Sequence, residues 1–327
     1  MSGEPILVTG GAGYIGSHVC KQLSKVGNLP VVMDNLSVGH ADAVKWGPLV
    51  TADIRDTTAV EATLRDYGIK RVMHFAAFAY VGESVAHPIA YYDNNVGGMI
   101  SLLKACGAAG VESLILSSSC ATYGIPEHLP ISEDTPQNPV NPYGRTKLIC
   151  EHMLRDAQTA PGLRFAALRY FNAAGADPEG ELSERHDPET HVIPLALMAA
   201  AGRRAHFDVY GTDYPTPDGS CIRDFIHVED LARGHVEALA HLDAGKDSFA
   251  VNLGTGKGHS VLELVAAIER LTGSRLPVRH RPRRAGDPPV LVADAAKARD
   301  LLGFEARSSD LDTLIRDAMP GFVGPMQ

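Results

Sequence analysis

The sequence lacks the cysteine patterns that stabilise small secreted proteins or bind zinc. Its five cysteines (Cys20, Cys106, Cys120, Cys150 and Cys221) are scattered along 327 residues, and no two of them form a Cys-x-x-Cys pair. This spacing argues against a disulfide scaffold and a zinc site, and it is typical of a chain kept reduced in the cytoplasm. We therefore predict a cytoplasmic protein that uses no metal.

Long apolar runs and an excess of positive charge are missing as well. The longest mostly apolar stretch, residues 192–201, is about half the length of a membrane span and contains Pro194. The first residues lack the basic segment and apolar core of a signal peptide. The formal net charge is −9, whereas a nucleic-acid backbone requires a basic face on its partner. We expect neither membrane nor nucleic acid as a partner.

Short apolar runs alternate with helical patterns in the first half of the chain. The helical patterns cover residues 14–26, 57–67 and 94–109. The strand patterns lie at residues 6–9, 31–33, 49–50, 71–75, 114–116 and 165–170. Continuously apolar strands separated by helices indicate a parallel sheet that is covered on both faces. We predict a doubly wound, Rossmann-like α/β fold with its ligand crevice beyond the carboxyl ends of the strands.

The pattern changes after Tyr170. Residues 172–217 are rich in Gly, Pro, Asp and Glu, and helical patterns return at 194–201, 230–242 and 261–271. We predict that residues 1–171 form the Rossmann-like domain, which segments near 226–257 complete. Residues 172–327 would form a smaller domain that closes over the crevice.

Three glycines stand between the first strand and the first helix, as Gly10-x-x-Gly13-x-x-Gly16. Glycines at this place allow a tight turn and let a pyrophosphate approach the backbone at the helix N-terminus. Asp34 ends the second strand, where a carboxylate accepts hydrogen bonds from an adenosine ribose and repels a 2′-phosphate. This combination predicts NAD, rather than NADP, as the cofactor.

A candidate catalytic set follows the fifth strand. Tyr143 and Lys147 are four residues apart and so share one helix face, and Ser119 ends the strand. A tyrosine has an ordinary pKa of about 10, which a neighbouring ammonium and the positive ring of NAD would lower. We predict that Tyr143 removes a proton from a substrate hydroxyl, that Ser119 binds the same oxygen, and that Lys147 supports the phenolate.

The glycine spacing resembles that of the extended short-chain dehydrogenase/reductase superfamily. In that superfamily an acid after the third strand holds the adenine, and Asp53-Ile54 matches this place; Phe75-Ala76-Ala77 matches the small residues beside the cofactor. The resemblance implies that NAD is bound by Gly10, Gly13, Tyr14, Ile15, Gly16, Asp34, Asn35, Asp53, Ile54, Phe75, Ala76, Ala77, Asn94, Ser117, Tyr143, Lys147 and Tyr170.

Within that superfamily, nearly the whole chain resembles the UDP-glucose 4-epimerases. The matching segments are residues 10–18, 34–36, 81–84, 91–95, 117–119, 141–144, 169–172, 210–215, 221–228 and 282–287. The resemblance implies reversible, NAD-dependent 4-epimerisation of UDP-glucose and UDP-galactose through a 4-keto intermediate. It also implies that the two predicted domains bind NAD and the nucleotide-sugar, and that two chains form a homodimer through helices near 94–109 and 142–159.

The same resemblance implies a set of substrate-binding residues. Asn172, Arg223 and Arg284 would hold the diphosphate, Tyr210 would stack on the uracil, and Asp287 would bind the uridine ribose. Arginine suits phosphate, which explains a local basic cluster on an acidic protein. The remaining expected contacts are Ser119, Tyr143, Phe171, Val192 and Leu291, the last at the position that gates N-acetylated sugars in the family.

Three alternatives bear on the function. Ala79 stands where enteric and animal epimerases carry a lysine. Residues 75–84 look more like pentose epimerases of plants and bacterial epimerases of exopolysaccharide pathways, so UDP-xylose/UDP-arabinose interconversion stays open. A 4,6-dehydratase would need an acid/base pair where this chain has Cys120-Ala121, which disfavours dehydration. The complete Ser119, Tyr143 and Lys147 set argues against a catalytically idle NAD-sensing scaffold.

Overall fold

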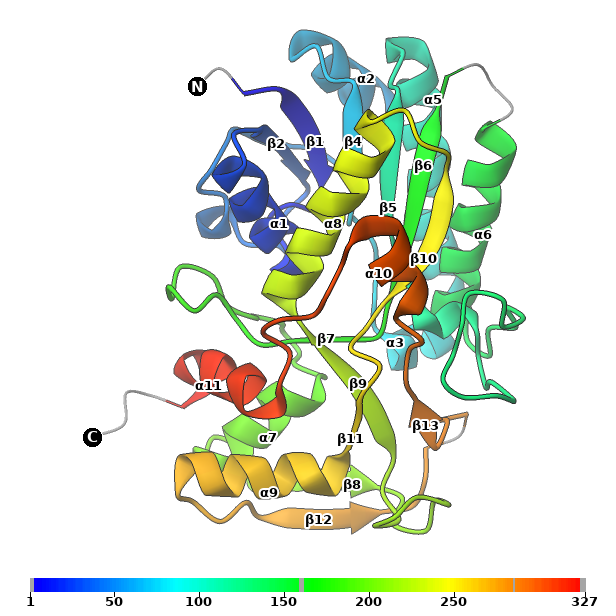
Figure 1. The fold of residues 1–327 in the computed structure, drawn as a ribbon. Helices are drawn as coiled ribbons and strands as arrows, with labels where there is room; N and C mark the ends of the chain where they lie inside the picture. The colour runs from blue at the N-terminus through cyan, green and yellow to red at the C-terminus, as the bar shows by residue number, and fades with distance from the viewer. Residues whose placement is uncertain (1–2, 159–161, 285, 324–327) are drawn as a thin grey trace.

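A seven-stranded parallel sheet organises the computed structural model, which describes residues 3–158, 162–284 and 286–323 (Figure 1). The strand order is β10-β6-β5-β4-β1-β2-β3. The strands are β1 (Pro5–Thr9), β2 (Leu29–Asp34), β3 (Leu49–Thr51), β4 (Arg71–His74), β5 (Ser113–Ser119), β6 (Arg164–Tyr170) and β10 (Phe249–Leu253). The predicted doubly wound α/β fold is confirmed, and β10 adds a late segment of the chain to the edge of the sheet.

Both faces of this sheet are covered by helices, which is why its strands are apolar throughout. Ile6 and Val8 of β1 point into one core cluster and Leu7 into another, as the two-residue repeat of a strand requires. Helices α1 (Tyr14–Lys25) and α8 (Val228–Asp243) pack together on the first face, in front of the sheet in Figure 1. The second face carries α2 (Thr57–Asp66), α5 (Gly98–Ala109) and α6 (Pro142–Ala157).

The helix boundaries differ slightly from the predicted ones, and the structure adds several short helices. The helix expected at 94–109 is a π-helical segment, η2 (Tyr92–Gly97), that continues into α5. The helix expected at 142–159 is α6, which ends at Ala157 with Gln158 as its C-cap, and residue 159 lies outside the described chain. The other short helices are η1 (Ala41–Ala43), α3 (Val81–Ala86), α4 (Pro88–Tyr91), η3 (Cys120–Thr122) and α10 (Ala296–Leu302).

A second group of elements lies below the carboxyl ends of the strands in Figure 1. Its strands are β7 (Asn172–Ala174), β8 (Phe207–Tyr210), β9 (Ile222–His227), β11 (Gly258–Ser260), β12 (Val278–Arg281) and β13 (Val290–Leu291). Its helices are α7 (Val192–Ala200), α9 (Val261–Thr272) and α11 (Leu311–Phe322). They share a separate apolar core around Phe225, Leu264 and Leu314.

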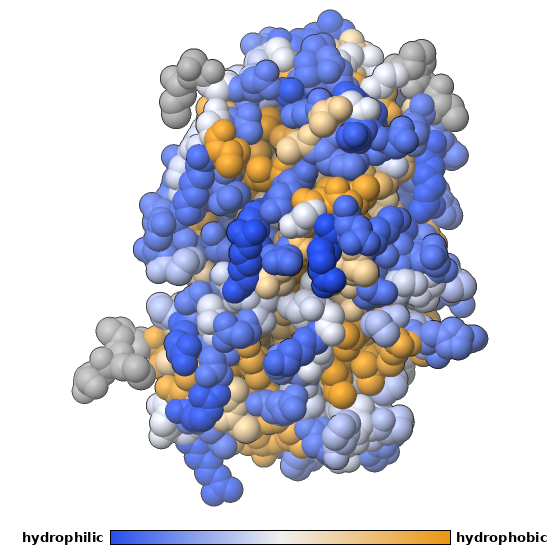
Figure 2. All heavy atoms as spheres, in the orientation of Figure 1, coloured by the Kyte–Doolittle hydropathy of each residue, from blue (hydrophilic) through white to orange (hydrophobic). Residues whose placement is uncertain are grey.

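The outer surface is mixed in polarity. Hydrophilic side chains cover most of the face seen in Figure 2, and apolar patches appear in both its upper and its lower parts. Among the described residues, the structure contains no helix of the length and apolar character that a membrane crossing requires.

Candidate active site

One large cavity lies between the carboxyl ends of the sheet strands and the lower group of elements. Its volume is about 1360 Å³, larger than the roughly 300–1,000 Å³ of a pocket for one small ligand. The expected residues that line it are Gly10, Gly13, Tyr14, Ile15, Gly16, Asp34, Asn35, Ile54, Phe75, Ala76, Ala77, Asn94, Ser117, Ser119, Tyr143, Lys147, Tyr170, Phe171, Asn172, Val192, Tyr210, Arg223, Arg284, Asp287 and Leu291. Of the expected site residues, Asp53 alone does not line it.

The glycine loop opens the N-terminus of α1 toward this cavity. No side chain caps the helix and no acidic residue stands in its first turn, so its free N–H groups and positive end suit an anion. A Cβ on Gly16 would lie 2.3 Å from the Gly10 carbonyl oxygen. Gly10 itself has φ +71°, and a Cβ there would lie 2.5 Å from the Ala76 nitrogen. The loop therefore closes only with glycine, and it fits a pyrophosphate.

Asp34 is held in place at the end of β2. Its carboxylate accepts hydrogen bonds from the backbone N–H groups of Ala12, at 3.1 Å, and Leu36, at 2.8 Å. Leu36 adopts a left-handed conformation with φ +58° directly after this turn. The side chain of Asp34 thus sits beside the glycine loop, where an adenosine ribose would be bound.

Asp53, expected to hold the adenine, is engaged by two neighbouring side chains, and its expected role stays a prediction. Its carboxylate accepts hydrogen bonds from Arg55 Nη2, at 2.8 Å, and from Asn35 Nδ2, at 3.1 Å. The Arg55 guanidinium is its strongest partner and holds the pKa of Asp53 far below its ordinary value. Ile54, the next residue, lines the cavity instead.

The three candidate catalytic residues meet at the junction of β5 and α6. Asn141 caps α6 by accepting the Gly144 N–H at 2.8 Å, which places Tyr143 and Lys147 on the first two turns. Lys147 Nζ lies 5.9 Å from the centroid of the Tyr143 ring and donates to the Ser117 carbonyl oxygen at 2.7 Å. The set predicted from sequence is therefore together in space.

Burial dominates the electrostatics of this set. Loss of water raises the pKa of Tyr143 to about 12, although a hydrogen bond with Ser119 acts in the opposite direction. Burial also lowers the pKa of Lys147 to about 8. Burial is the largest influence on the Tyr143 pKa and acts against the lowering expected from Lys147, whose ammonium is directed to the Ser117 carbonyl oxygen.

Two further cofactor-side residues are fixed by polar contacts. The Ser117 hydroxyl shares a short hydrogen bond with the Tyr170 hydroxyl across β5 and β6. Asn94 Nδ2 donates to Asn95 Oδ1 at 3.0 Å, and Asn95 Nδ2 donates to Thr146 Oγ1 at 3.0 Å on α6. The π-helical segment η2 thereby presents Asn94 to the cavity next to the catalytic helix.

The expected nucleotide-sugar residues gather at the other end of the cavity. Arg223 Nη2 donates to Asp287 Oδ1 at 2.5 Å, and the Arg284 guanidinium lies 3.9 Å from the centroid of the Tyr210 ring. Asn172 Nδ2 donates to the Asp224 carbonyl oxygen at 3.0 Å. Two arginines, one aromatic ring and one carboxylate thus face the same space, the set that a nucleoside diphosphate needs.

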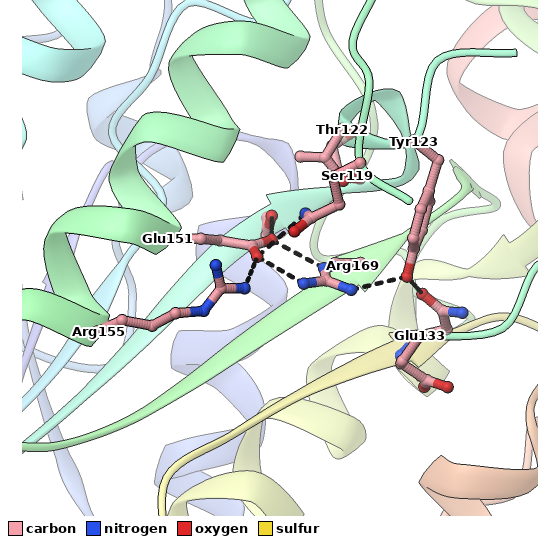
Figure 3. Close-up of polar contacts among 10 residues, drawn as sticks. Ser119, Thr122, Tyr123, Glu133, Glu151, Arg155 and Arg169 are labelled. Carbon is pink, nitrogen blue, oxygen red and sulfur yellow. Dashed lines mark hydrogen bonds and ion pairs between the residues drawn. The ribbon is translucent and has the colours of Figure 1, made fainter. Parts of the chain in front are cut away.

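A buried ion pair that the sequence motifs did not predict lies next to the candidate catalytic residues (Figure 3). Arg169 on β6 donates to both carboxylate oxygens of Glu151 on α6, at 2.9 and 2.6 Å. Ser118, next to Ser119, donates its hydroxyl to Glu151 Oε1 at 2.6 Å. The spacing of Tyr143, Lys147 and Glu151 at four-residue intervals was the available signal, since it places all three on one helix face.

The ion pair extends toward the lower group of elements. Arg169 Nη1 donates to the Tyr123 hydroxyl at 2.8 Å, which donates to Asn252 Oδ1 at 2.7 Å (Figure 3). Asn252 Nδ2 donates to the Ile131 carbonyl oxygen at 2.9 Å, and Ile131 pairs with Ala293, two residues after Leu291. One polar chain therefore connects α6 with the segment that carries the nucleotide-sugar candidates.

Comparison with known proteins places the chain among proteins with this architecture. Residues 6–254 match the NAD dependent epimerase/dehydratase family. A UDP-glucose 4-epimerase from Rhizobium leguminosarum bv. trifolii is 52% identical over 318 residues, 97% of each chain. A UDP-glucose 4-epimerase from Brucella ovis in complex with NAD superimposes with a TM-score of 0.96 at 60% identity, covering 98% of each chain.

A third relative carries a pentose ligand. The UDP-glucose-4-epimerase from Stenotrophomonas maltophila, crystallised with NAD and formylated UDP-arabinopyranose, is 44% identical over 97% of each chain, with a TM-score of 0.94. The resemblance seen in the sequence motifs is thus confirmed over nearly the full length of the chain. Because the family match, the strand order and the site geometry agree, this chain belongs to the NAD dependent epimerase/dehydratase family.

Proposed function

We propose that this protein catalyses the reversible, NAD-dependent 4-epimerisation of UDP-glucose and UDP-galactose. The observation that carries the proposal is that one cavity contains the glycine-lined N-terminus of α1, the Ser119, Tyr143 and Lys147 set, and the Arg223, Arg284, Tyr210 and Asp287 group. Relatives named as UDP-glucose 4-epimerases and aligned over nearly the whole chain support it.

The cofactor half of the cavity fits NAD. The uncapped N-terminus of α1 would hold the pyrophosphate, and Asp34 would accept the hydroxyls of the adenosine ribose. When bound, NAD supplies reversible acceptance of a hydride from C4 of the sugar and a positive ring charge near the phenol.

The protein's own residues would move the proton. Tyr143 would accept the proton of the 4-hydroxyl and later return it, and Ser119 would hydrogen-bond the same oxygen. Lys147, fixed on the Ser117 carbonyl, keeps an ammonium within 5.9 Å of the Tyr143 ring centroid. Because burial alone holds the phenol protonated, proton release by Tyr143 depends on positive charge brought close to it.

A difference in how tightly the nucleotide and the hexose are bound would allow inversion at C4. Arg223 and Arg284 would bind the diphosphate and Tyr210 the uracil, so the nucleotide is held strongly while the hexose is held weakly. After oxidation the flat 4-keto sugar could rotate about its diphosphate linkage and present its other face. Return of the hydride then gives the opposite configuration.

UDP-xylose/UDP-arabinose interconversion is the second candidate. Ala79 lines the cavity at the place where a lysine stands in enteric and animal epimerases. The Stenotrophomonas maltophila relative was crystallised with a UDP-arabinopyranose derivative. A panel of UDP-hexoses and UDP-pentoses would rank the two substrate classes by kcat/KM.

The test of the main proposal is incubation of purified protein with UDP-galactose and no added electron acceptor. We expect UDP-glucose to accumulate to an equilibrium mixture without stoichiometric consumption of NAD. Stoichiometric reduction of NAD would refute epimerisation, and a 4-keto-6-deoxy product would indicate a dehydratase.

We also propose that the protein works as a homodimer in the cytoplasm, with residues 1–171 and late segments near 226–257 binding NAD and residues 172–327 binding the nucleotide-sugar. Exposed apolar side chains support the dimer: Val85 on α3 is 63% exposed, Ile89 on α4 is 77% exposed, and Ile100 on α5 is 43% exposed. Large apolar side chains left this exposed are the kind that a protein interface covers. The helices α5 and α6 that were expected to form it border the same side of the sheet.

A further inference from the structure

Four potential metal ligands converge in the segment that precedes α7. Glu184, His186, Glu189 and His191 each offer one ligand atom, and these atoms lie within 4.8 Å of one another. Glu184 Oε1 lies 3.1 Å from His186 Nδ1 and 2.9 Å from His191 Nδ1. The absence of paired cysteines predicted no metal site, but that criterion does not cover a Glu-x-His-x-x-Glu-x-His spacing.

Glu189 is the member whose second oxygen accepts no hydrogen bond from the described residues. Its Oε1 accepts the backbone N–H groups of Thr190, at 2.7 Å, and His191, at 2.8 Å. Its Oε2 is buried and, within the described part of the chain, accepts no hydrogen bond, while the side chain is only 7% exposed. This free oxygen lies 3.7 Å from His186 Nδ1. The backbone therefore orients Glu189 so that an unused carboxylate oxygen faces the imidazoles.

The spacing suits a four-coordinate ion. Bonds of about 2.0–2.1 Å to nitrogen and oxygen place tetrahedral ligand atoms about 3.3 Å apart. The three distances of 2.9, 3.1 and 3.7 Å lie on both sides of that value. Two carboxylates carry two negative charges, which balance one divalent cation when both imidazoles are neutral.

We propose that Glu184, His186, Glu189 and His191 bind one divalent transition-metal ion of the zinc class. Two imidazole nitrogens and two carboxylate oxygens are ligands that zinc accepts, whereas calcium and magnesium prefer oxygen alone. The ion holds the segment from Glu184 to His191 in one conformation at the start of α7.

The proposed ion lies where it would steady the wall of the cavity. All four ligands line that cavity. The His186 ring stands edge-on to Tyr14, with centroids 6.1 Å apart, and to Tyr80, with centroids 5.9 Å apart. Tyr14 is the first residue of α1, and its hydroxyl donates to the Gly175 carbonyl oxygen at 2.7 Å. The ion would thus join the segment before α7 to the first turn of the cofactor-side helix.

A neighbouring cluster of three acidic residues differs from the proposed metal site because a lysine already fills it. Asp177, Glu179 and Glu181 also come together, but the Lys21 ammonium already occupies their centre, 2.7, 2.8 and 2.7 Å from the three carboxylates. That cluster has its cation within the chain. It therefore serves as a matched control for acidic residues in the same segment that bind no added metal.

The test uses full-length protein without a histidine tag, freed of metal with a chelator and then titrated with Co²⁺ or Zn²⁺. We expect one high-affinity ion per chain, strong visible d–d absorption of four-coordinate Co²⁺, and a Zn²⁺-dependent rise in Tm. His186→Asn/His191→Asn should weaken binding by more than about 100-fold, since even outer contacts of a metal site cost 10- to 100-fold. The control Glu179→Gln/Glu181→Gln should bind as the wild type does.

Two outcomes would overturn the proposal: a wild-type chain that binds no stoichiometric ion, and a histidine double variant that binds as tightly as wild type. If the double variant does not fold, X-ray absorption at the zinc edge of the Zn²⁺-loaded wild-type protein identifies the ligand atoms around the ion. A shell of two nitrogens and two oxygens at about 2.0–2.1 Å supports the site. A shell that contains sulfur or only oxygen contradicts it.

Discussion

Arg169 and Glu151 form a bidentate ion pair that is buried next to the candidate catalytic residues. Arg169 Nε and Nη2 donate to the two oxygens of Glu151 at 2.9 and 2.6 Å, and both side chains are at most 3% exposed. Burial by itself would raise the pKa of Glu151, but the hydrogen bonds from Arg169 and Ser118 outweigh burial and lower it. The pair joins α6, which carries Tyr143 and Lys147, to β5 and β6.

Removing one charge of this pair should destabilise the protein strongly. Glu151→Gln leaves the Arg169 guanidinium buried without a counter-ion, and we expect a loss of about 3–5 kcal/mol in the free energy of unfolding. Glu151→Leu/Arg169→Met removes both charges, so its loss should be clearly smaller. Urea denaturation of the three proteins measures the difference. Equal losses in the single and double variants would show that the pairing is unimportant.

Tyr143→Phe should abolish most of the activity while leaving the fold intact. The change deletes only the hydroxyl that we propose as the proton acceptor, and general acid–base groups contribute about 10²- to 10⁴-fold to the rate. We expect kcat to fall within that range while NAD and UDP still bind. The control is Tyr67→Phe, a 38% exposed tyrosine at the end of α2. Wild-type turnover by Tyr143→Phe would contradict the proposed mechanism.

Lys147 should make stability depend on pH in the alkaline range. Its pKa of about 8 in the folded protein lies below the ordinary 10.5 because the ammonium is buried. Below pH 8 the lysine is charged in both states and the burial cost is fully present. Between pH 8 and 10.5 the unfolded chain binds more protons, so the free energy of unfolding rises with pH.

The matched variant for this effect is Lys147→Met, which cannot titrate. Relative to it, the wild type should gain on the order of 2–3 kcal/mol between pH 8 and 10.5. Comparing the two proteins at each pH cancels the contributions of other titrating groups. Unfolding curves of the two proteins that run parallel across this window would disprove the assignment.

Arg284 and Arg283 are adjacent in sequence but should differ in substrate binding. Arg284 lines the cavity beside Tyr210, whereas the Arg283 guanidinium stacks over Tyr214 at 4.4 Å and pairs with Asp213. Arg284→Ala should raise the Kd for UDP by roughly 10- to 100-fold, the value of a hydrogen bond to a charged group. Titration calorimetry with UDP measures both variants. An equal effect of Arg283→Ala would mean that the cluster acts only through its total charge.

The exposed apolar side chains of α4 and α5 should stabilise the proposed dimer. Ile89→Asp/Ile100→Asp places two charges on that surface, and we expect sedimentation to shift from dimer to monomer. Val26→Asp at the end of α1 is the control, because Val26 is 52% exposed on another helix. A monomeric wild type would remove the basis of the dimer proposal.

The sequence by itself determined the sheet, the glycine loop and the candidate catalytic set. These features depend on residues close together in the chain: apolar runs, Gly10-x-x-Gly13-x-x-Gly16, and Tyr143 with Lys147. Local spacing is sufficient there because strand and helix geometry place such residues directly. The family resemblance supplied the more distant substrate residues.

Only the tertiary structure decided which side chains form ion pairs with the buried charged groups. Glu151 and Arg169 come from different elements, and Glu184 and His191 meet through the bends of an irregular segment. The pKa of Tyr143 likewise follows from its removal from water, which no motif encodes. Pairing and burial depend on distances across the fold, so they become readable only once the chain is packed.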